Sequence, residues 1–196
     1  MDNSVNRQDG FFLGRISRSI FKNGILGQKI GDSITFADVK VWGKNNVDLS
    51  GMPSNVSALG VTFQRGQITT ENGFLILRDM DSVRIKDMWM EGNPTQPGYT
   101  VASAIQINNS HDVQIDGLMI AVPQNGSSAA PYQVIGMDQS KETKIRNSTF
   151  LNKAASAHIY GNASTVRTKL DSNTCNNRNT PEVPPPPSCV VVLQGS

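Results

Sequence analysis

One pattern of apolar residues recurs along this chain at a nearly constant spacing. Its clearest copy is VQIDGLMI at residues 113–120, in which apolar residues occupy offsets 0, +2, +5 and +7. Copies with the same offsets stand thirty residues earlier, in VRIKDMWM at 83–90, and thirty residues later, in TKIRNSTF at 143–150, where Thr and Ser fill two positions. Self-similarity at a period of roughly 20–50 residues indicates units that stack on one another. This pattern limits the possible folds more than any other feature of the chain.

Further copies extend the pattern toward both ends. They begin at Ile34 and Val61 before the central copies and at Thr168 after them, and a weaker copy begins at Phe11. The residue at offset +2 is large and apolar in every copy: Leu13, Phe36, Phe63, Ile85, Ile115, Ile145 and Leu170. So uniform a column predicts seven stacked units in which equivalent side chains share one environment.

The spacing within each copy predicts two short strands. Offsets 0 and +2, and again +5 and +7, alternate as the side chains of a strand with one buried face do. The step from +2 to +5 breaks this alternation and predicts a bend between the strands. A third strand is expected before each copy, where apolar pairs align at thirty-residue spacing: Leu75 with Leu77, Ile105 with Ile107, and Ile135 with Met137. Each unit is therefore strand, polar turn, strand, bend, strand and variable loop.

Three short strands per unit, without an apolar stretch of helical length, predict an all-β solenoid: a single-stranded parallel β-helix of about seven short coils. Coils that pair at about 4.8 Å would form a column ~30–35 Å tall. A leucine-rich repeat would show Leu-x-x-Leu-x-Leu with a regular Asn, which this chain lacks. A β-sandwich is the less favoured alternative, because it would not align like residues at a fixed period.

The N-terminal end differs from the repeats. Residues 1–30 are interpreted as an N-terminal cap or an irregular first coil. One option is an amphipathic cap helix with Phe12, Ile16 and Ile20 on one face. A cap is expected because the open end of a solenoid exposes a strand edge and apolar core.

Residues 31–196 are expected to form the β-helix, with a proline-rich loop at 176–188. The run CVVVLQGS after this loop predicts the first strand of a last, partial coil. Cys175 falls on an inward offset and is interpreted as a buried free thiol, while a disulfide with Cys189 is the alternative.

Composition and charge exclude several functional classes. The chain has 196 residues, with 18 basic and 16 acidic side chains and a net charge of +2, which does not indicate a nucleic-acid partner. No apolar segment approaches the ~20 residues that span a membrane, and MDNSVNRQDG lacks the apolar core of a signal peptide. No Cys–His spacing suggests zinc, so neither a metal nor another cofactor is expected.

Charged side chains form columns at the bend between the two strands. At offset +4, Asp38, Arg65 and Asp87 follow one another in consecutive coils. At offset +3 the signs also alternate: Lys86, Asp116, Arg146 and Asp171. A column of alternating sign is explained by attraction between neighbouring strands, so it is interpreted as structural. If the chain were an enzyme, Asp87 and Asp116 would be the candidate catalytic pair.

The loop after the third strand varies strongly in length between coils. WGKNNVDLSGMPSNVS, EGNPTQPGYTVAS, AVPQNGSSAAPYQ and NNRNTPEVPPPPS are all expected to leave the same corner. Long loops on a rigid repeat often form binding surfaces, although these loops could also be merely long. Aromatic rings and amides suit sugar rings, and the predicted binding residues are Trp42, Asn93, Tyr99, Asn125 and Tyr132.

A second feature of the repeat faces outward. Offset +6 points away from the core and carries Trp89 and, in the next coil, Met119. Phe74 and Ile76 are also expected at outward positions. Exposed apolar residues in a stack predict a contact surface between copies, as in a homotrimer. Cover by the N-terminal segment or a neighbouring loop is the alternative explanation.

The segments FLILRDMDSVRIKDMWMEG and AIQINNSHDVQIDGLMIAV resemble the right-handed β-helix of the pectate-lyase superfamily. Within that superfamily, residues 30–195 resemble in style the spike and appendage proteins of tailed bacteriophages. The resemblance implies a virion protein, a trimer, and recognition of bacterial surface polysaccharide or of other virion proteins. The Asp-Pro-His-Asp motif of the alginate-epimerase branch is absent, so the resemblance assigns no catalytic residue.

Two functional hypotheses follow for the chain. The favoured one is a phage-type appendage protein that binds a surface glycan or partner proteins through its long loops. The alternative is a polysaccharide-degrading enzyme, either a lyase or a glycoside hydrolase, which would need a general base or a pair of carboxyl groups.

Overall fold

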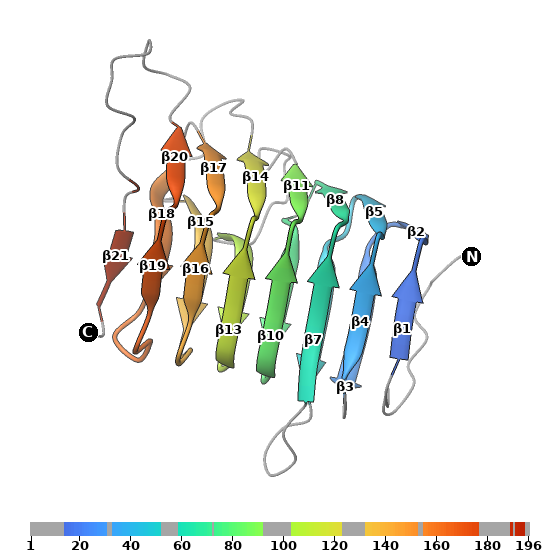
Figure 1. Cartoon of the computed structure of the whole chain (residues 1–196), viewed down its shortest axis with the longest axis horizontal. Helices are drawn as coiled ribbons and strands as arrows, with labels where there is room; N and C mark the ends of the chain where they lie inside the picture. Colours follow the sequence, from blue (N-terminus) through green and yellow to red (C-terminus); the bar gives the residue numbers. More distant parts are fainter. Residues whose placement is uncertain are drawn as a thin grey trace.

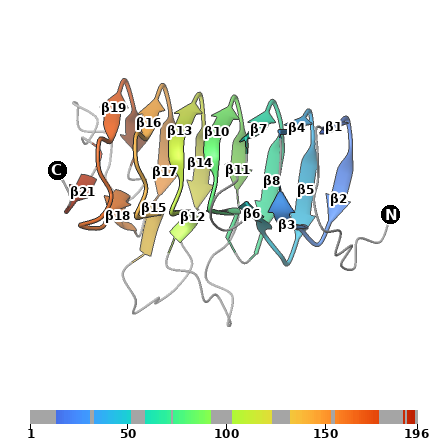
Figure 2. The ribbon, with the colours of Figure 1, turned by 90° about the horizontal axis from the view of Figure 1, so that it is seen from below.

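The computed structural model describes residues 14–30, 33–51, 59–71, 73–91, 103–122, 132–152, 155–176, 189 and 191–194. Within these residues every regular element is a β-strand. The strands form three parallel sheets of seven strands each, which confirms the predicted parallel β-helix (Figure 1). The seven coils lie side by side along the long axis of the molecule (Figure 2).

The three sheets are named here A, B and C. Sheet A contains β1 (Gly14–Ser17), β4 (Ile34–Ala37), β7 (Leu59–Gln64), β10 (Asp81–Lys86), β13 (His111–Asp116), β16 (Lys144–Arg146) and β19 (Lys169–Asp171). Sheet B contains β2 (Ile20–Lys22), β5 (Lys40–Gly43), β8 (Gln67–Thr70), β11 (Trp89–Glu91), β14 (Met119–Val122), β17 (Thr149–Asn152) and β20 (Thr174–Asn176). Sheet C contains β3 (Ile25–Ile30), β6 (Val47–Gly51), β9 (Leu75–Arg78), β12 (Ser103–Asn108), β15 (Tyr132–Asp138), β18 (Ala155–Gly161) and β21 (Val191–Leu193).

The bend between sheets A and B is made by one residue with positive φ in each coil. The seven residues are Arg18, Asp38, Arg65, Asp87, Gly117, Asn147 and Ser172, with φ between 50° and 68°. The left-handed conformation reverses the chain direction within one residue, and Asp, Asn and Gly adopt it most readily. This corner is the physical cause of the step from +2 to +5 in the sequence pattern.

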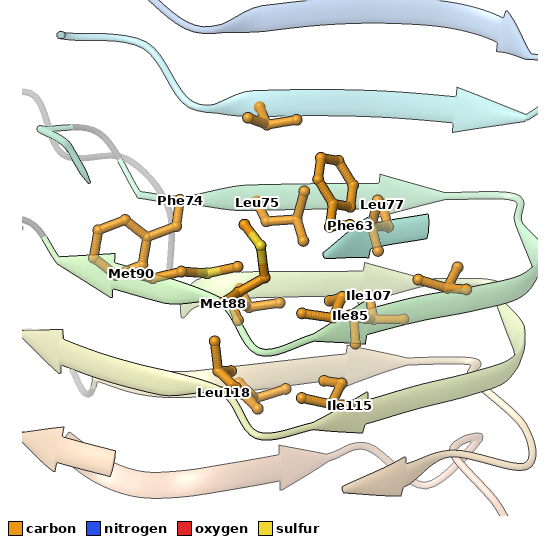
Figure 3. Close-up of a cluster of buried hydrophobic side chains, with 14 of the residues drawn as sticks. Phe63, Phe74, Leu75, Leu77, Ile85, Met88, Met90, Ile107, Ile115 and Leu118 are labelled. Atoms are coloured by element: carbon orange, nitrogen blue, oxygen red, sulfur yellow. The ribbon is translucent and has the colours of Figure 1, made fainter. Parts of the chain in front are cut away.

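The apolar columns fill the interior, as predicted. The side chains at offset +2 from Phe36 to Ile145 are almost fully buried. Phe36 and Phe63 stack with ring centroids 4.7 Å apart and an interplanar angle of 6°. In Figure 3, side chains from sheets A, B and C, among them Ile85, Met90 and Ile107, point into one shared interior.

The register predicted for the first coil is wrong by three residues. Ile16 pairs with Phe36, so Ile16 and not Leu13 occupies the +2 column. Residues 14–30 form three strands of a regular coil, and the option of a cap helix is wrong for this stretch. Ile16 faces inward while Ile20 is 67% exposed, because the two lie on either side of the corner at Arg18. Leu13 and Phe12 lie outside the described residues.

The segment at 42–57 was predicted to be a loop, but it contains strand β6. Val47 and Leu49 alternate and are buried like the pair Leu75 and Leu77, with which they are in register. The short connection at 44–46 therefore joins sheet B to sheet C, and residues 52–58 join sheet C to sheet A. This second connection leaves a different corner from the one that the sequence predicted.

Cys175 and Cys189 form a disulfide, so the prediction of a free thiol is wrong. Their Cα atoms lie 5.0 Å apart, and Cys175 is buried on β20. Cys189 lies just before β21, so the bond ties the start of the last strand to the seventh coil. The sequence alone left this pairing open, because nothing in the spacing places residue 189 against the core.

The stacked phenylalanines should dominate the stability of the N-terminal half. We expect Phe63→Ala to lower the free energy of unfolding by about 3–5 kcal/mol, because it leaves a cavity in a fully buried site. Denaturant titration followed by circular dichroism measures the change. Thr62→Ala, at the adjacent outward position, should cost less than about 1 kcal/mol. Equal losses for the two variants would contradict the assigned facing of β7.

The disulfide should stabilise the last coil. The cysteines are 14 residues apart in the chain, and closing a loop of this length stabilises a protein by about 3 kcal/mol. Cys189→Ala should lower the free energy of unfolding by about this amount in the absence of reductant. Reductant should lower the parent protein to the same value and leave the variant unchanged. A parent protein that is insensitive to reductant would contradict the bond.

Candidate functional site

The outer face of sheet B carries the most distinctive surface side chains of the described residues. On each strand, the residues on either side of the buried one point outward. The register places the first outward residues in one column: Ile20, Lys40, Gln67, Trp89, Met119, Thr149 and Thr174. It places the second outward residues in a parallel column: Lys22, Trp42, Thr69, Glu91, Ala121 and Leu151.

Two tryptophans stand out on this face. Trp42 is 50% exposed and Trp89 is 43% exposed, the highest values among the aromatic side chains that the structure describes. They lie on β5 and β11, which are separated only by β8 (Figure 1). Two strand spacings and a two-residue offset put their Cα atoms roughly 12 Å apart. Two exposed indole rings on one face place apolar area close together at the surface, which is a feature of contact surfaces.

Neighbouring polar groups hold the two indole rings. Trp89 Nε1 donates a hydrogen bond to Glu91 Oε2 at 3.3 Å. The Lys22 Nζ lies 5.4 Å from the centroid of the Trp42 ring, within the range of a cation–π interaction. Each ring is therefore oriented before any ligand arrives, which reduces the entropy lost on binding.

Strand β8 places hydrogen-bonding groups between the two tryptophans. Gln67 Nε2 donates to Thr69 Oγ1 at 3.2 Å, and both side chains are partly exposed. The amide oxygen of Gln67 and the hydroxyl proton of Thr69 are left for other partners in this arrangement. Flat apolar rings beside amide and hydroxyl groups match a sugar, which presents C–H groups on one face and hydroxyls at its edge.

Of the five predicted binding residues, the structure describes the side chain of Trp42 alone. Trp42 lies on the outer face of sheet B, as described above. Asn93, Tyr99 and Asn125 lie outside the described residues, as does the side chain of Tyr132 at the start of β15. The connections at 92–102, 123–131 and 177–190 all run from sheet B to sheet C, so three of the four long loops leave the predicted corner.

The four apolar residues predicted to form a contact surface between copies do not lie on one exposed surface. Trp89 and Met119 are neighbours in sheet B, as expected. Phe74 and Ile76 are only 2% and 7% exposed, so the prediction of their exposure is wrong. Phe74 precedes β9 and packs into the core beside Met90 (Figure 3). Ile76 points outward from sheet C, a different sheet, between Asp48 and Gln106 in the register.

In the structure, charged side chains of the predicted columns form ion pairs between adjacent coils. Arg65 donates two hydrogen bonds to the Asp38 carboxylate, at 3.0 and 3.2 Å. Arg146 and Asn147 both donate to Asp116, with Arg146 Nη2 2.8 Å and Asn147 Nδ2 2.9 Å from its oxygens. The hydrogen bond from Asn147, followed by that from Arg146, holds the pKa of Asp116 below its ordinary value of 3.8.

Asp87 occupies the left-handed corner, and its amide donates to the Asp116 carbonyl at 2.9 Å. The backbone thus brings the candidate catalytic pair, Asp87 and Asp116, onto adjacent coils. A general acid for glycoside cleavage needs a raised pKa, whereas the shift of Asp116 is in the opposite direction. The arrangement supports the interpretation that these carboxylates stabilise the stacked coils and do not catalyse a reaction.

Two findings bear on other kinds of site. Among the described residues, no group of three or more His, Cys, Asp or Glu side chains is placed to hold a metal ion. The described part of the chain also contains no helix that could cross a membrane.

Comparisons with protein-family models, with curated proteins and with solved structures found no match to this chain. The fold assignment therefore rests on the sheet topology.

Sequence reasoning missed most of the residues on this face. It examined offset +6, which holds Trp89, but it did not continue to offset +8, which holds Thr69 and Glu91. It also assigned Trp42 to a loop, although Trp42 stands at offset +8 from Ile34. Continuing the strand alternation by two residues would have placed both tryptophans on one face.

The ladder at Asp116 gives a prediction for the dependence of stability on pH. Because the folded-state pKa of Asp116 is lowered, its ionised form stabilises the fold above pH 3.8, and this contribution is lost as the pH falls through the folded-state pKa. Asp116→Asn should therefore reduce the free energy of unfolding at pH 7, by less than about 1 kcal/mol for a pair this exposed. Denaturation at pH 7 and pH 2 should show the difference disappearing in acid. A difference that persists unchanged at pH 2 would point to packing instead.

Proposed function

We propose that this chain is a surface-glycan-binding β-helix and that the outer face of sheet B is its binding surface. The observation that carries the proposal is the pair of exposed, oriented tryptophans, Trp42 and Trp89, on one rigid face. The resemblance of the coils to phage spike and appendage proteins supports a right-handed winding, a virion setting and assembly as a homotrimer.

The shape of the surface favours an extended polysaccharide over a small molecule. The face extends over seven strands, and ladders of backbone hydrogen bonds hold those strands in register. A rigid, extended surface binds a chain-like ligand by repeated contacts, each of modest strength. The spacing of the two indole rings, roughly 12 Å, allows them to stack on different sugar residues of one chain.

Cleavage of the polysaccharide has less support. The candidate pair, Asp87 and Asp116, lies at the corner between sheets A and B, and Asp116 is paired with Arg146. A hydrolase needs one carboxyl group that is protonated at its working pH. Release of oligosaccharides after incubation with polysaccharide would identify the chain as an enzyme and would contradict the binding-only proposal.

Substitution of the tryptophans tests the proposed surface. Trp42→Ala and Trp89→Ala should each weaken binding to bacterial surface polysaccharide on a printed array roughly tenfold, which corresponds to about 1.4 kcal/mol. The loss is expected because each ring contributes stacking and buried apolar area. Leu26→Ala removes an exposed apolar side chain from sheet C and should leave the affinity unchanged. Thermal unfolding confirms that the variants remain folded.

A measurement of mass in solution separates glycan binding from contact between copies. If the outer face of sheet B bound a second copy, Trp89→Glu would reduce the mass of the assembly. An unchanged mass together with lost glycan binding supports the proposal. A reduced mass with unchanged glycan binding would assign the face to an interface between copies instead.

A further inference from the structure

Charge is unevenly distributed along the outer face of sheet B. Lys22 and Lys40 lie in the first two coils, next to Trp42. Glu91 lies in the fourth coil, next to Trp89. The third coil, between them, presents only the neutral Gln67 and Thr69. The part of the face between the two tryptophans therefore has a basic end at Trp42, in the second coil, and an acidic end at Trp89, in the fourth coil.

The basic end is arranged around Trp42. Lys22 is the direct neighbour of Trp42 on strand β2, and Lys40 precedes Trp42 by two residues on the same side of β5. Both lysines are exposed, and neither forms an ion pair with a described residue. Two like charges on adjacent strands repel each other, and an anion bound between them would relieve this repulsion.

The acidic end is arranged around Trp89. Glu91 accepts the hydrogen bond of the Trp89 indole, and it remains exposed on the surface. Within the described residues, no Lys or Arg forms an ion pair with it. An anionic group stacked on Trp89 would therefore be repelled by the Glu91 carboxylate.

We infer that the outer face of sheet B binds a mixed polysaccharide, with an anionic sugar residue at Trp42 and a neutral sugar residue at Trp89. This inference rests on the proposed glycan-binding function. It adds which sugar residue of the ligand is charged and in which direction the polysaccharide lies along the face. The carboxylate of the anionic residue pairs with Lys22 and Lys40. The neutral residue stacks on Trp89, and its hydroxyls meet Gln67 and Thr69. A polymer with a carboxylate on every residue fits less well, because one carboxylate would face Glu91.

An array with three classes of bacterial polysaccharide tests the inference. The classes are neutral polymers, polymers with one uronate per repeating unit among neutral sugars, and polyuronates. Binding should be strongest to the second class. Strongest binding to neutral polymers or to polyuronates would overturn the inference while leaving the glycan-binding function in place. Binding to none of the three classes would overturn the function itself.

Two variants then assign the effect to the named side chains. On the second class, Lys22→Gln with Lys40→Gln should weaken binding about tenfold, because two exposed charge pairs are lost. Lys86→Gln with Lys144→Gln makes the same charge change on sheet A and should have no effect. After chemical reduction of the carboxyl groups of the polysaccharide, the parent and the double variant should bind equally. A difference that persists would contradict pairing between the lysines and the uronate.

Glu91→Gln tests the acidic end by a gain of binding. The amide oxygen of Gln can still accept the hydrogen bond of Trp89, so the ring keeps its orientation. The variant should bind polyuronates several-fold more tightly than the parent and bind neutral polymers equally. An unchanged preference against polyuronates would overturn the role of Glu91 in selecting a neutral residue at this end.

Discussion

The corner between sheets A and B is the constraint on which the rest of this structure depends. One residue in the left-handed conformation turns the chain in every coil, from Arg18 to Ser172. That turn sets which residues of the next strand point inward and which point outward. Six of the seven residues are not glycine, so most of these positions adopt a conformation that an L-amino acid otherwise avoids. The stack maintains it because the six corner amides from Arg18 to Asn147 are hydrogen-bonded to the next coil, as Asp38 N is to Gln64 O.

The same geometry divides the outward side chains into two kinds. At the corner, neighbouring coils approach closely and the charged side chains pair with one another, as Arg65 does with Asp38. On the outer face of sheet B the side chains instead include two tryptophans, two lysines without an ion pair among the described residues, and one glutamate. Charges that neutralise one another support the fold, while those that do not remain available for a ligand. This distinction separates the structural carboxylates from the candidate site more clearly than their residue types do.

Several features could be predicted from the sequence because they depend on local periodicity. The strands, the bend and the inward columns follow from offsets 0, +2, +5 and +7, and the structure confirms them in the coils from Ile34 onward. The first coil was placed in the wrong register because its apolar residues are few and the Leu13 alternative fits the pattern equally well. Strand β6 was missed because Val47 and Leu49 stand within a polar segment. The burial of Phe74 could not be predicted, because it depends on how the chain enters β9 after the turn that follows β8.

The sequence by itself determined the repeat, the number of coils and the facing of most core residues, because each of these depends on side-chain alternation over a few residues. Only the tertiary structure decided which outward side chains pair with one another and which remain exposed. Trp42 and Trp89 are 47 positions apart in the chain, and they share a face because coils of unequal length still stack in register. The disulfide between Cys175 and Cys189 was likewise decided by the return of the chain to the seventh coil. Contacts between coils depend on loop length and register together, and neither is encoded in the local pattern.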